Sequence, residues 1–364
     1  MVWQDKEIGT FVNARFIPLR VTPSDSKYFQ IRADYKVRGT PTALFLNSQG
    51  EEIDRNLGFD GKRDKYFQTI KDISSGKNTL LSLMGNLKKN PDDVETNFKI
   101  GKRYIDRYEW ENVQPYFSKV LEMDPEDTKG FKSESTYNLA VYETRTNKNI
   151  EPLQNFIATC TDHDLLYQSY GILASHFIRA KKLDKASELY EEALEKLPDS
   201  ANLMTDYAMF VFTSNVEDKY KKGFERAKKA MTLAPDDEEV LFSSYYSLIS
   251  YYKNTENQEK YFATYEEVLS KMPKDTFFMY GYAEAILKSK NEDKYDRGIA
   301  IAKEALELEP QAAHIWHSLG RLYDEKGDRK NAVKAVKKAV EINPGSKIYK
   351  ATLEKLEGEK LENE

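Results

Sequence analysis

Apolar residues recur at helical spacing from about Asp92 to Pro344, and the helical stretches end at prolines set at a nearly constant interval. Successive intervals are 34, 73, 37, 38, 37 and 34 residues, and the longest holds two units. A proline at such a place stops one helix and lets the next begin. The prolines are Pro91, Pro125, Pro198, Pro235, Pro273, Pro310 and Pro344. A fixed period of this length predicts a repeat of helical hairpins rather than an ordinary bundle.

The last unit shows the pattern most fully, with large residues on its first helix and small ones where two helices approach closely. Its signature residues are Trp316, Leu319, Gly320, Tyr323, Ala332, Ala339 and Pro344. In this it resembles a tetratricopeptide repeat. The resemblance implies a mainly α fold, an α-solenoid, and we count seven hairpins over residues 92–344. Residues 345–364 should form a capping helix and a tail, because a terminal repeat otherwise exposes its apolar face.

The first ninety residues follow a different pattern. Short apolar runs at Arg15–Val21 and Thr42–Leu46 predict strands, and Glu51–Leu57 alternates as a second hairpin arm would. Asp60–Ile73 has the period of a helix, and residues 76–91 are expected to be a linker. This segment is therefore predicted to be α/β and distinct from the array.

The loop from Tyr35 to Thr42 resembles the cis-proline loop of thioredoxins, and the resemblance covers residues 1–75. It implies that Pro41 is the cis-proline and that Thr40 precedes it. The thioredoxin pattern should also contain a Cys-x-x-Cys motif and a central strand, and both are absent here. Either the chain is truncated or the segment has lost its chemistry and serves as a cap. Truncation is favoured, since removing a central strand leaves backbone groups unpaired.

Composition and charge argue against several classes of function. The 55 basic and 60 acidic residues are interleaved and give a formal charge of −5, so no basic field is available to attract nucleic acid or anionic lipid. The absence of an 18-residue apolar run predicts no membrane span. No secretory signal is visible, which indicates a cytoplasmic protein as given, or a periplasmic or envelope protein if an upstream signal peptide exists. The single cysteine, Cys160, cannot form a disulfide within the chain.

No catalytic, cofactor or metal site is predicted. His314 and His317 share a helix face without a third ligand, and the Cys160–His163 spacing lacks a second pair of ligands. The chain as given is therefore not expected to be an enzyme or to need a cofactor.

Aromatic residues are the candidates for partner binding. Aligning the repeats on Leu319–Gly320 puts four rings at one equivalent position on the inner helices, which line the concave surface: Phe98, Tyr137, Tyr245 and Tyr280. Tyr246, Tyr252 and Phe212 lie near them. Rings on a groove supply large contact area at low entropic cost. The alternative is that these rings pack between hairpins.

The sequence thus predicts a scaffold that binds a protein or peptide on the concave face of the array. The alternative is a thiol-disulfide oxidoreductase of the thioredoxin type whose catalytic half is missing from this chain. A homo-oligomer formed through the incomplete N-terminal sheet is a further expectation.

Overall fold

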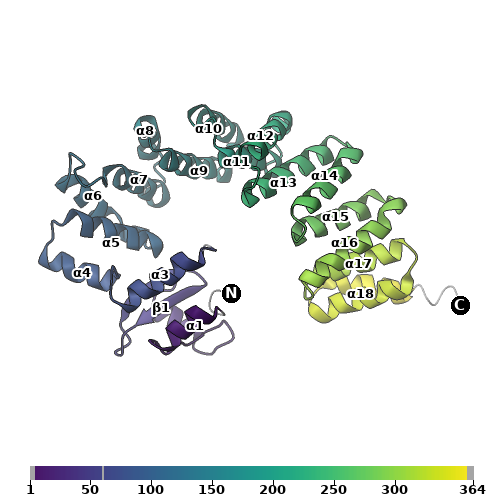
Figure 1. Cartoon of the computed structure of the whole chain (residues 1–364), viewed down its shortest axis with the longest axis horizontal. Coiled ribbons are helices and arrows are strands. Elements are labelled where there is room, and N and C mark those ends of the chain that lie inside the picture. The colour runs from purple at the N-terminus through teal and green to yellow at the C-terminus, as the bar shows by residue number, and fades with distance from the viewer. Residues whose placement is uncertain (1–4, 60, 359–364) are drawn as a thin grey trace. The chain divides into compact units, whose positions relative to one another are not determined.

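The computed structural model describes residues 5–59 and 61–358, which form nineteen α-helices and one two-stranded sheet (Figure 1). The chain is therefore a mainly helical array with a small sheet near its N-terminus. It divides into two compact units, residues 1–193 and 194–364, and each is described by itself.

The first unit contains the sheet and the earlier helices. Its elements are α1 (Lys6–Asn13), α2 (Tyr28–Asp34), β1 (Thr42–Leu46), β2 (Glu52–Leu57), α3 (Arg63–Ser74), α4 (Leu80–Lys89), α5 (Val94–Asp106), α6 (Gln114–Met123), α7 (Lys132–Tyr142), α8 (Glu151–Thr159), α9 (His163–Arg179) and α10 (Leu183–Lys196), at whose last turn the unit ends.

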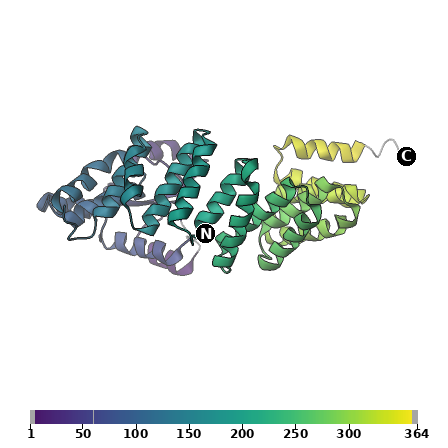
Figure 2. The ribbon, with the colours of Figure 1, turned by 90° about the horizontal axis from the view of Figure 1, so that it is seen from above.

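The second unit contains helices and no strand over its described residues. It consists of α11 (Ala201–Thr213), α12 (Tyr220–Leu233), α13 (Glu238–Asn254), α14 (Gln258–Lys271), α15 (Thr276–Ser289), α16 (Tyr295–Leu308), α17 (Ala313–Glu325), α18 (Arg329–Ile342) and α19 (Lys347–Gly358). The expected cap helix is present as α19, drawn in yellow at the C-terminal end in Figure 2. It closes the unit through Leu356, which is buried with Ala332 and Val336 of α18.

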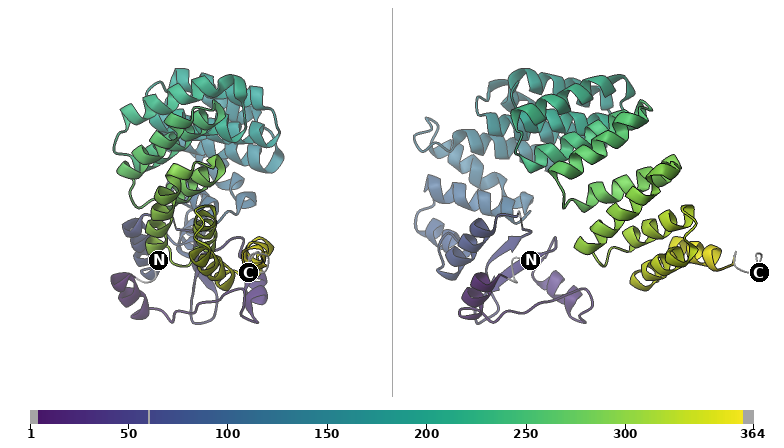
Figure 3. Two further views of the ribbon diagram at one scale, coloured as in Figure 1. Left: turned by 90° about the vertical axis from the view of Figure 1, so that its right-hand side faces the viewer. Right: turned by 45° about the vertical axis from the view of Figure 1, so that its right-hand side comes forward.

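The N-terminal segment has a core of its own. Strands β1 and β2 are antiparallel, with Thr42 opposite Leu57, and helices α1 and α3 pack on Phe45. Figure 3 shows this segment in purple. The buried apolar residues of this core are Ile8, Val12, Phe45, Tyr66, Phe67, Ile70 and Ile73.

Two expectations for this segment are wrong. Arg15–Val21 forms no strand, because no neighbouring strand pairs with it among the described residues and Pro18 lacks a backbone donor. Residues 76–91 are not a plain linker, since they contain α4. That helix forms because Thr79 caps it by accepting a hydrogen bond from the Ser82 backbone N–H and because Leu83 is buried.

A buried ion network joins this segment to the first repeat. The carboxylate of Asp54, on β2, is fully buried and accepts hydrogen bonds from the Leu80 backbone N–H at 3.0 Å and from Arg103 at 2.5 Å. Arg107 lies 3.5 Å from Asp54 and donates to Glu52 at 2.5 Å. Buried charges persist only when paired in this way. The network therefore fixes β2 against α4 and α5.

The helices from α5 to α18 form seven successive pairs, three in the first unit and four in the second. The first helix of every pair is followed by one residue with positive φ, and these residues are Tyr108, Lys148, Lys181, Asn215, Glu256, Lys290 and Gly327. A left-handed residue of this kind ends a helix and turns the chain. It also gives each repeat an internal reference position.

Seven residues before each reference residue, the first helix carries a buried residue that is small in five of the seven pairs. In the last pair this residue is Gly320. A Cβ built there would lie 2.4 Å from a methyl carbon of Val336 and 3.1 Å from the carbonyl oxygen of Ala332. The small residue is thus required by the close approach of α17 and α18, as the sequence pattern indicated.

Candidate functional site

The four aromatic candidates do not occupy equivalent places. Phe98 lies ten residues before its reference residue, Tyr108, and Tyr280 lies ten before Lys290. Tyr137 lies eleven residues before Lys148, and Tyr245 lies eleven residues before Glu256. Tyr170 and Trp316 occupy this eleventh position in their own repeats. The expected alignment fails because α9 and α13 have 17 residues where α17 has 13, and because a π-helical turn follows α7.

The two rings at the eleventh position are buried. Tyr245 is 1% exposed, and its hydroxyl donates to Glu267 at 2.9 Å. The buried Tyr137 donates to Gln168 at 3.2 Å. Burial raises the pKa of Tyr137 to about 12, and burial together with the Glu267 carboxylate raises that of Tyr245. These contacts are those of packing residues, the alternative role that the sequence left open.

The two rings at the tenth position remain half-buried. Phe98 stacks on Phe131 with 4.3 Å between ring centroids, and it also touches Phe117. Tyr280 meets the imidazole of His314 edge-on at 4.7 Å. Phe98 and Tyr137 belong to the first unit, and Tyr245 and Tyr280 belong to the second.

In the second unit, three separate ring contacts join α13 to α15, α15 to α17 and α17 to α19, and each includes a residue at the tenth position. Tyr246 of α13 lies 6.2 Å from Phe277 of α15, and Tyr280 of α15 lies 4.7 Å from His314 of α17. His317 of α17 lies 4.8 Å from Tyr349 of α19. We call these six residues the aromatic row: Tyr246, Phe277, Tyr280, His314, His317 and Tyr349.

The aromatic row is partly open to solvent. Phe277 is 51% exposed and His314 is also exposed, whereas Tyr246, Tyr280 and Tyr349 are half-buried. The sequence analysis missed Phe277 and Tyr349 and named Tyr246 only as a neighbour. Counting back from the turn residues Glu256 and Lys290 would have found Tyr246 and Tyr280 at the same position.

Polar groups flank the row between α15 and α17. Glu284 accepts hydrogen bonds from Ser318 at 2.5 Å and from Arg321 at 3.1 Å. His317 shares a hydrogen bond of 2.9 Å with Thr352 of α19. Burial, followed by the charge of Arg321, lowers the pKa of His317, so its ring is held neutral at pH 7. The surface therefore combines apolar rings with fixed donors and acceptors.

A shallow depression of about 420 Å³ adjoins the row at the turn between α16 and α17. It is lined by Glu309, Pro310, Gln311, Ala312, Ala313 and His314. The indole N–H of Trp316 donates to the carbonyl oxygen of Pro310 at 3.0 Å and fixes this turn. The depression extends the open surface beside His314.

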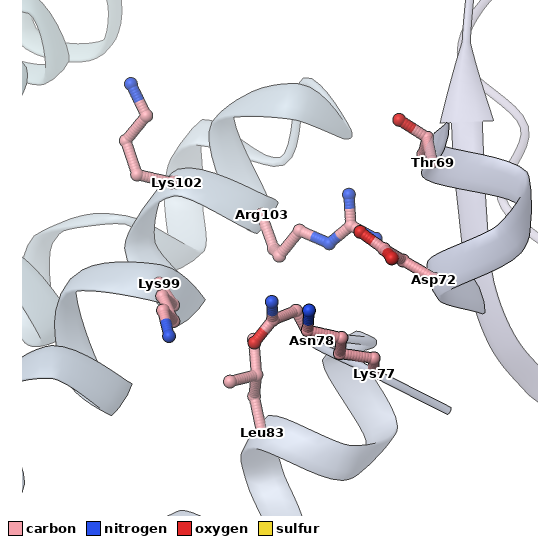
Figure 4. A pocket seen from close by; sticks show the side chains of 8 residues that line it. All are labelled: Thr69, Asp72, Lys77, Asn78, Leu83, Lys99, Lys102 and Arg103. Carbon is pink, nitrogen blue, oxygen red and sulfur yellow. The ribbon is translucent and has the colours of Figure 1, made fainter. Parts of the chain in front are cut away.

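A second depression, of about 190 Å³, lies in the first unit among α3, α4 and α5 (Figure 4). Its cations are largely neutralised by carboxylates of the chain: Lys99 pairs with Glu95, Lys102 with Glu134 and Arg103 with Asp54. Figure 4 shows Lys99 and Lys102 pointing away from Arg103. Because its charges are matched, this depression is a weaker candidate than the aromatic row.

The remaining candidates are placed as follows. The Thr40–Pro41 peptide bond is cis, in the loop that precedes β1. The Cys160 thiol is partly buried and donates to the carbonyl oxygen of Asp162 at 3.5 Å. Within residues 5–59 and 61–358, no three histidine, cysteine, aspartate or glutamate side chains converge as metal ligands would. Over the same residues, none of the helices has the length and apolar character needed to cross a membrane.

A BBSome complex member BBS4 homolog from Drosophila melanogaster is 20% identical over an alignment of 256 residues, which covers 66% of this chain and 49% of that protein. The chain thus spans about half the length of this relative.

Two solved structures also resemble parts of the chain. A tetratricopeptide repeat protein from Parabacteroides merdae is 15% identical, covers 72% of this chain and 98% of its own, and has a TM-score of 0.45. YrrB, described as a TPR protein with an unusual peptide-binding site, is 17% identical, covers 57% of this chain and 93% of its own, and has a TM-score of 0.38.

The match to a family model falls on the unit that carries the clearest signature. Residues 313–346, which comprise α17 and α18 with the turn after them, match the tetratricopeptide repeat family. This confirms the resemblance drawn from Trp316, Gly320 and Pro344. The chain therefore carries a tetratricopeptide repeat at residues 313–346, within its array of helix pairs.

Proposed function

We propose that the chain is a scaffold that binds a protein or peptide segment along the aromatic row of its second unit. The observation that carries this proposal is the run of ring contacts across α13, α15, α17 and α19, which leaves Phe277 and His314 exposed. Exposed apolar groups gathered on one surface and rimmed by polar groups are typical of interaction sites. The Drosophila relative is named as a complex member, which is consistent with this role.

The chemistry of the row suits a segment that presents apolar side chains. Rings supply contact area at low entropic cost, and the Glu284–Arg321 pair offers charged groups for hydrogen bonds to a bound backbone or side chain. Phe98 is proposed as a separate contact point on the first unit, because it is half-buried and lies at the same register position as Tyr280.

We also propose that residues 1–75 are part of a thioredoxin-like domain. The thioredoxin resemblance of residues 1–75 rests on the sequence around Thr40 and Pro41. If it holds, a longer natural protein would be a thiol-disulfide oxidoreductase with its Cys-x-x-Cys upstream of Met1. The present chain has a single cysteine, so it lacks the resolving thiol that such exchange requires.

Selection from a random peptide library, with the full chain as bait, tests the scaffold proposal. The selected peptides should bind Phe277→Ala and Tyr280→Ala about 30-fold more weakly, since a ring at a binding hot spot contributes about 2 kcal/mol. Leu308→Ala is the matched control, because Leu308 is 43% exposed on the second helix of its pair. Equal binding by the ring variants and the control would refute the proposal.

A further inference from the structure

The N-terminal segment contains a long stretch that lacks a covering surface. Between Val12 and Phe45, no residue is buried. Helix α2 has no buried residue at all, and its Phe29 is 73% exposed. Ile17 and Leu19 are 98% and 81% exposed. Large exposed apolar side chains that recur within one segment are typical of a surface that another chain covers.

The same stretch ends at an open edge of the sheet. The Pro41 carbonyl oxygen accepts a hydrogen bond from the Gly58 backbone N–H, and the Asn47 backbone N–H donates one to the Glu51 carbonyl oxygen. The backbone groups of the odd-numbered residues along β1 therefore point toward β2. Thr42, Leu44 and Leu46 therefore direct their backbone groups to the opposite edge. None of the three forms a backbone hydrogen bond there with another described residue.

The stretch also contains a segment without backbone partners. From Ile17 to Val21, no backbone group is hydrogen-bonded to another described residue. As a strand, this segment would place Pro18, which lacks an N–H, on the same edge as Phe16 and Arg20. The opposite edge, at Ile17, Leu19 and Val21, would then present three donors and three acceptors. That number matches the three residues on the free edge of β1.

We propose that two copies of the chain associate by reciprocal strand exchange, in which Ile17–Val21 of one copy pairs with the free edge of β1 in the other. One chain carries both the unpaired segment and the unpaired edge of β1, so a two-fold pair would give backbone partners to both segments and both edges at once. The exchange would also cover Ile17 and Leu19. An open edge flanked by exposed apolar residues is the arrangement that leads to such pairing.

The oligomeric state of the full chain tests this proposal. Light scattering coupled to size-exclusion chromatography should give the mass of a dimer, and Leu19→Lys should give the mass of a monomer with unchanged helical circular dichroism. Ile348→Lys is the matched control, because Ile348 is 68% exposed on α19, and this variant should remain dimeric. A monomeric wild-type chain, or a Leu19→Lys variant that stays dimeric, overturns the proposal.

Cysteine cross-linking separates exchange between chains from pairing within one chain. In a Cys160→Ser background, Leu19→Cys and Leu44→Cys proteins are mixed and oxidised. A disulfide between two chains is the expected product. If the double variant Leu19→Cys/Leu44→Cys instead forms its disulfide within a single chain at every concentration, the segment completes its own sheet and strand exchange is excluded.

Discussion

At the scale of single residues, one position along a helix separates a packing ring from a ring available for binding. Tyr245 and Tyr246 are adjacent, yet the first is 1% exposed and bonded to Glu267, whereas the second is half-buried and faces Phe277. Neighbouring residues on a helix point about 100° apart. An alignment of the repeats that is wrong by one residue therefore exchanges the buried ring and the accessible ring.

This difference predicts opposite effects of two truncations. Tyr245→Ala should lower the stability of the second unit by about 3 to 5 kcal/mol, because it opens a cavity and leaves the Glu267 carboxylate without its donor. Phe277→Ala should cost less than about 1 kcal/mol, because Phe277 is 51% exposed. Hydrogen exchange of α13 and α15 measures the loss of stability in each variant. Equal losses in the two variants would contradict the assignment of Tyr245 to packing.

At the scale of elements, the contact between α17 and α19 should depend on pH. His317 has a lowered pKa because it is buried and near Arg321, with Glu284 opposing the shift. As pH falls below the ordinary value of 6.5, the unfolded chain takes up a proton before the folded chain does. The stability contributed by neutral His317 is thus present above about pH 6.5 and lost on acidification.

Hydrogen exchange of α19 between pH 7 and pH 5 tests this prediction after correction for intrinsic exchange. Protection of α19 should fall with pH in the wild-type chain. His317→Gln keeps a side chain able to bond Thr352 but does not titrate, so its protection should change less. A similar pH response in both proteins would assign the effect to other groups.

The buried ion network is the element that joins β2 to the first repeat, and its loss should be costly. Asp54→Ala leaves Arg103 and Arg107 without a fully buried counter-charge, at a cost of about 3 to 5 kcal/mol. The control is Glu111→Ala, since the Arg38–Glu111 pair also joins the two regions but is about half exposed, and such pairs contribute about 0 to 1 kcal/mol.

Amide exchange in β2 and α5 compares the two variants. Asp54→Ala should raise the exchange rates of both elements together, because the network couples them, and Glu111→Ala should leave them nearly unchanged. If exchange in α5 stays at its wild-type rate in Asp54→Ala, the network does not hold the segment to the array.

At the scale of the whole molecule, the sequence by itself determined the repeat. The proline interval and the order of large and small residues depend on local helix geometry and on contacts between neighbouring helices. The seven helix pairs, Gly320 against Val336 and the cap helix α19 could therefore be predicted. Strand β1 was also predictable, because an apolar run bounded by a turn is a local signal.

Only the tertiary structure decided which rings are buried and which remain open to solvent. The register of the candidate rings depended on the length of each first helix and on the left-handed residue after it, neither of which the signature residues specify. The failed strand at Arg15–Val21 has the same cause: its apolar pattern is that of a strand, but a strand forms only where another segment supplies backbone partners, and sequence patterns do not show which partners are present.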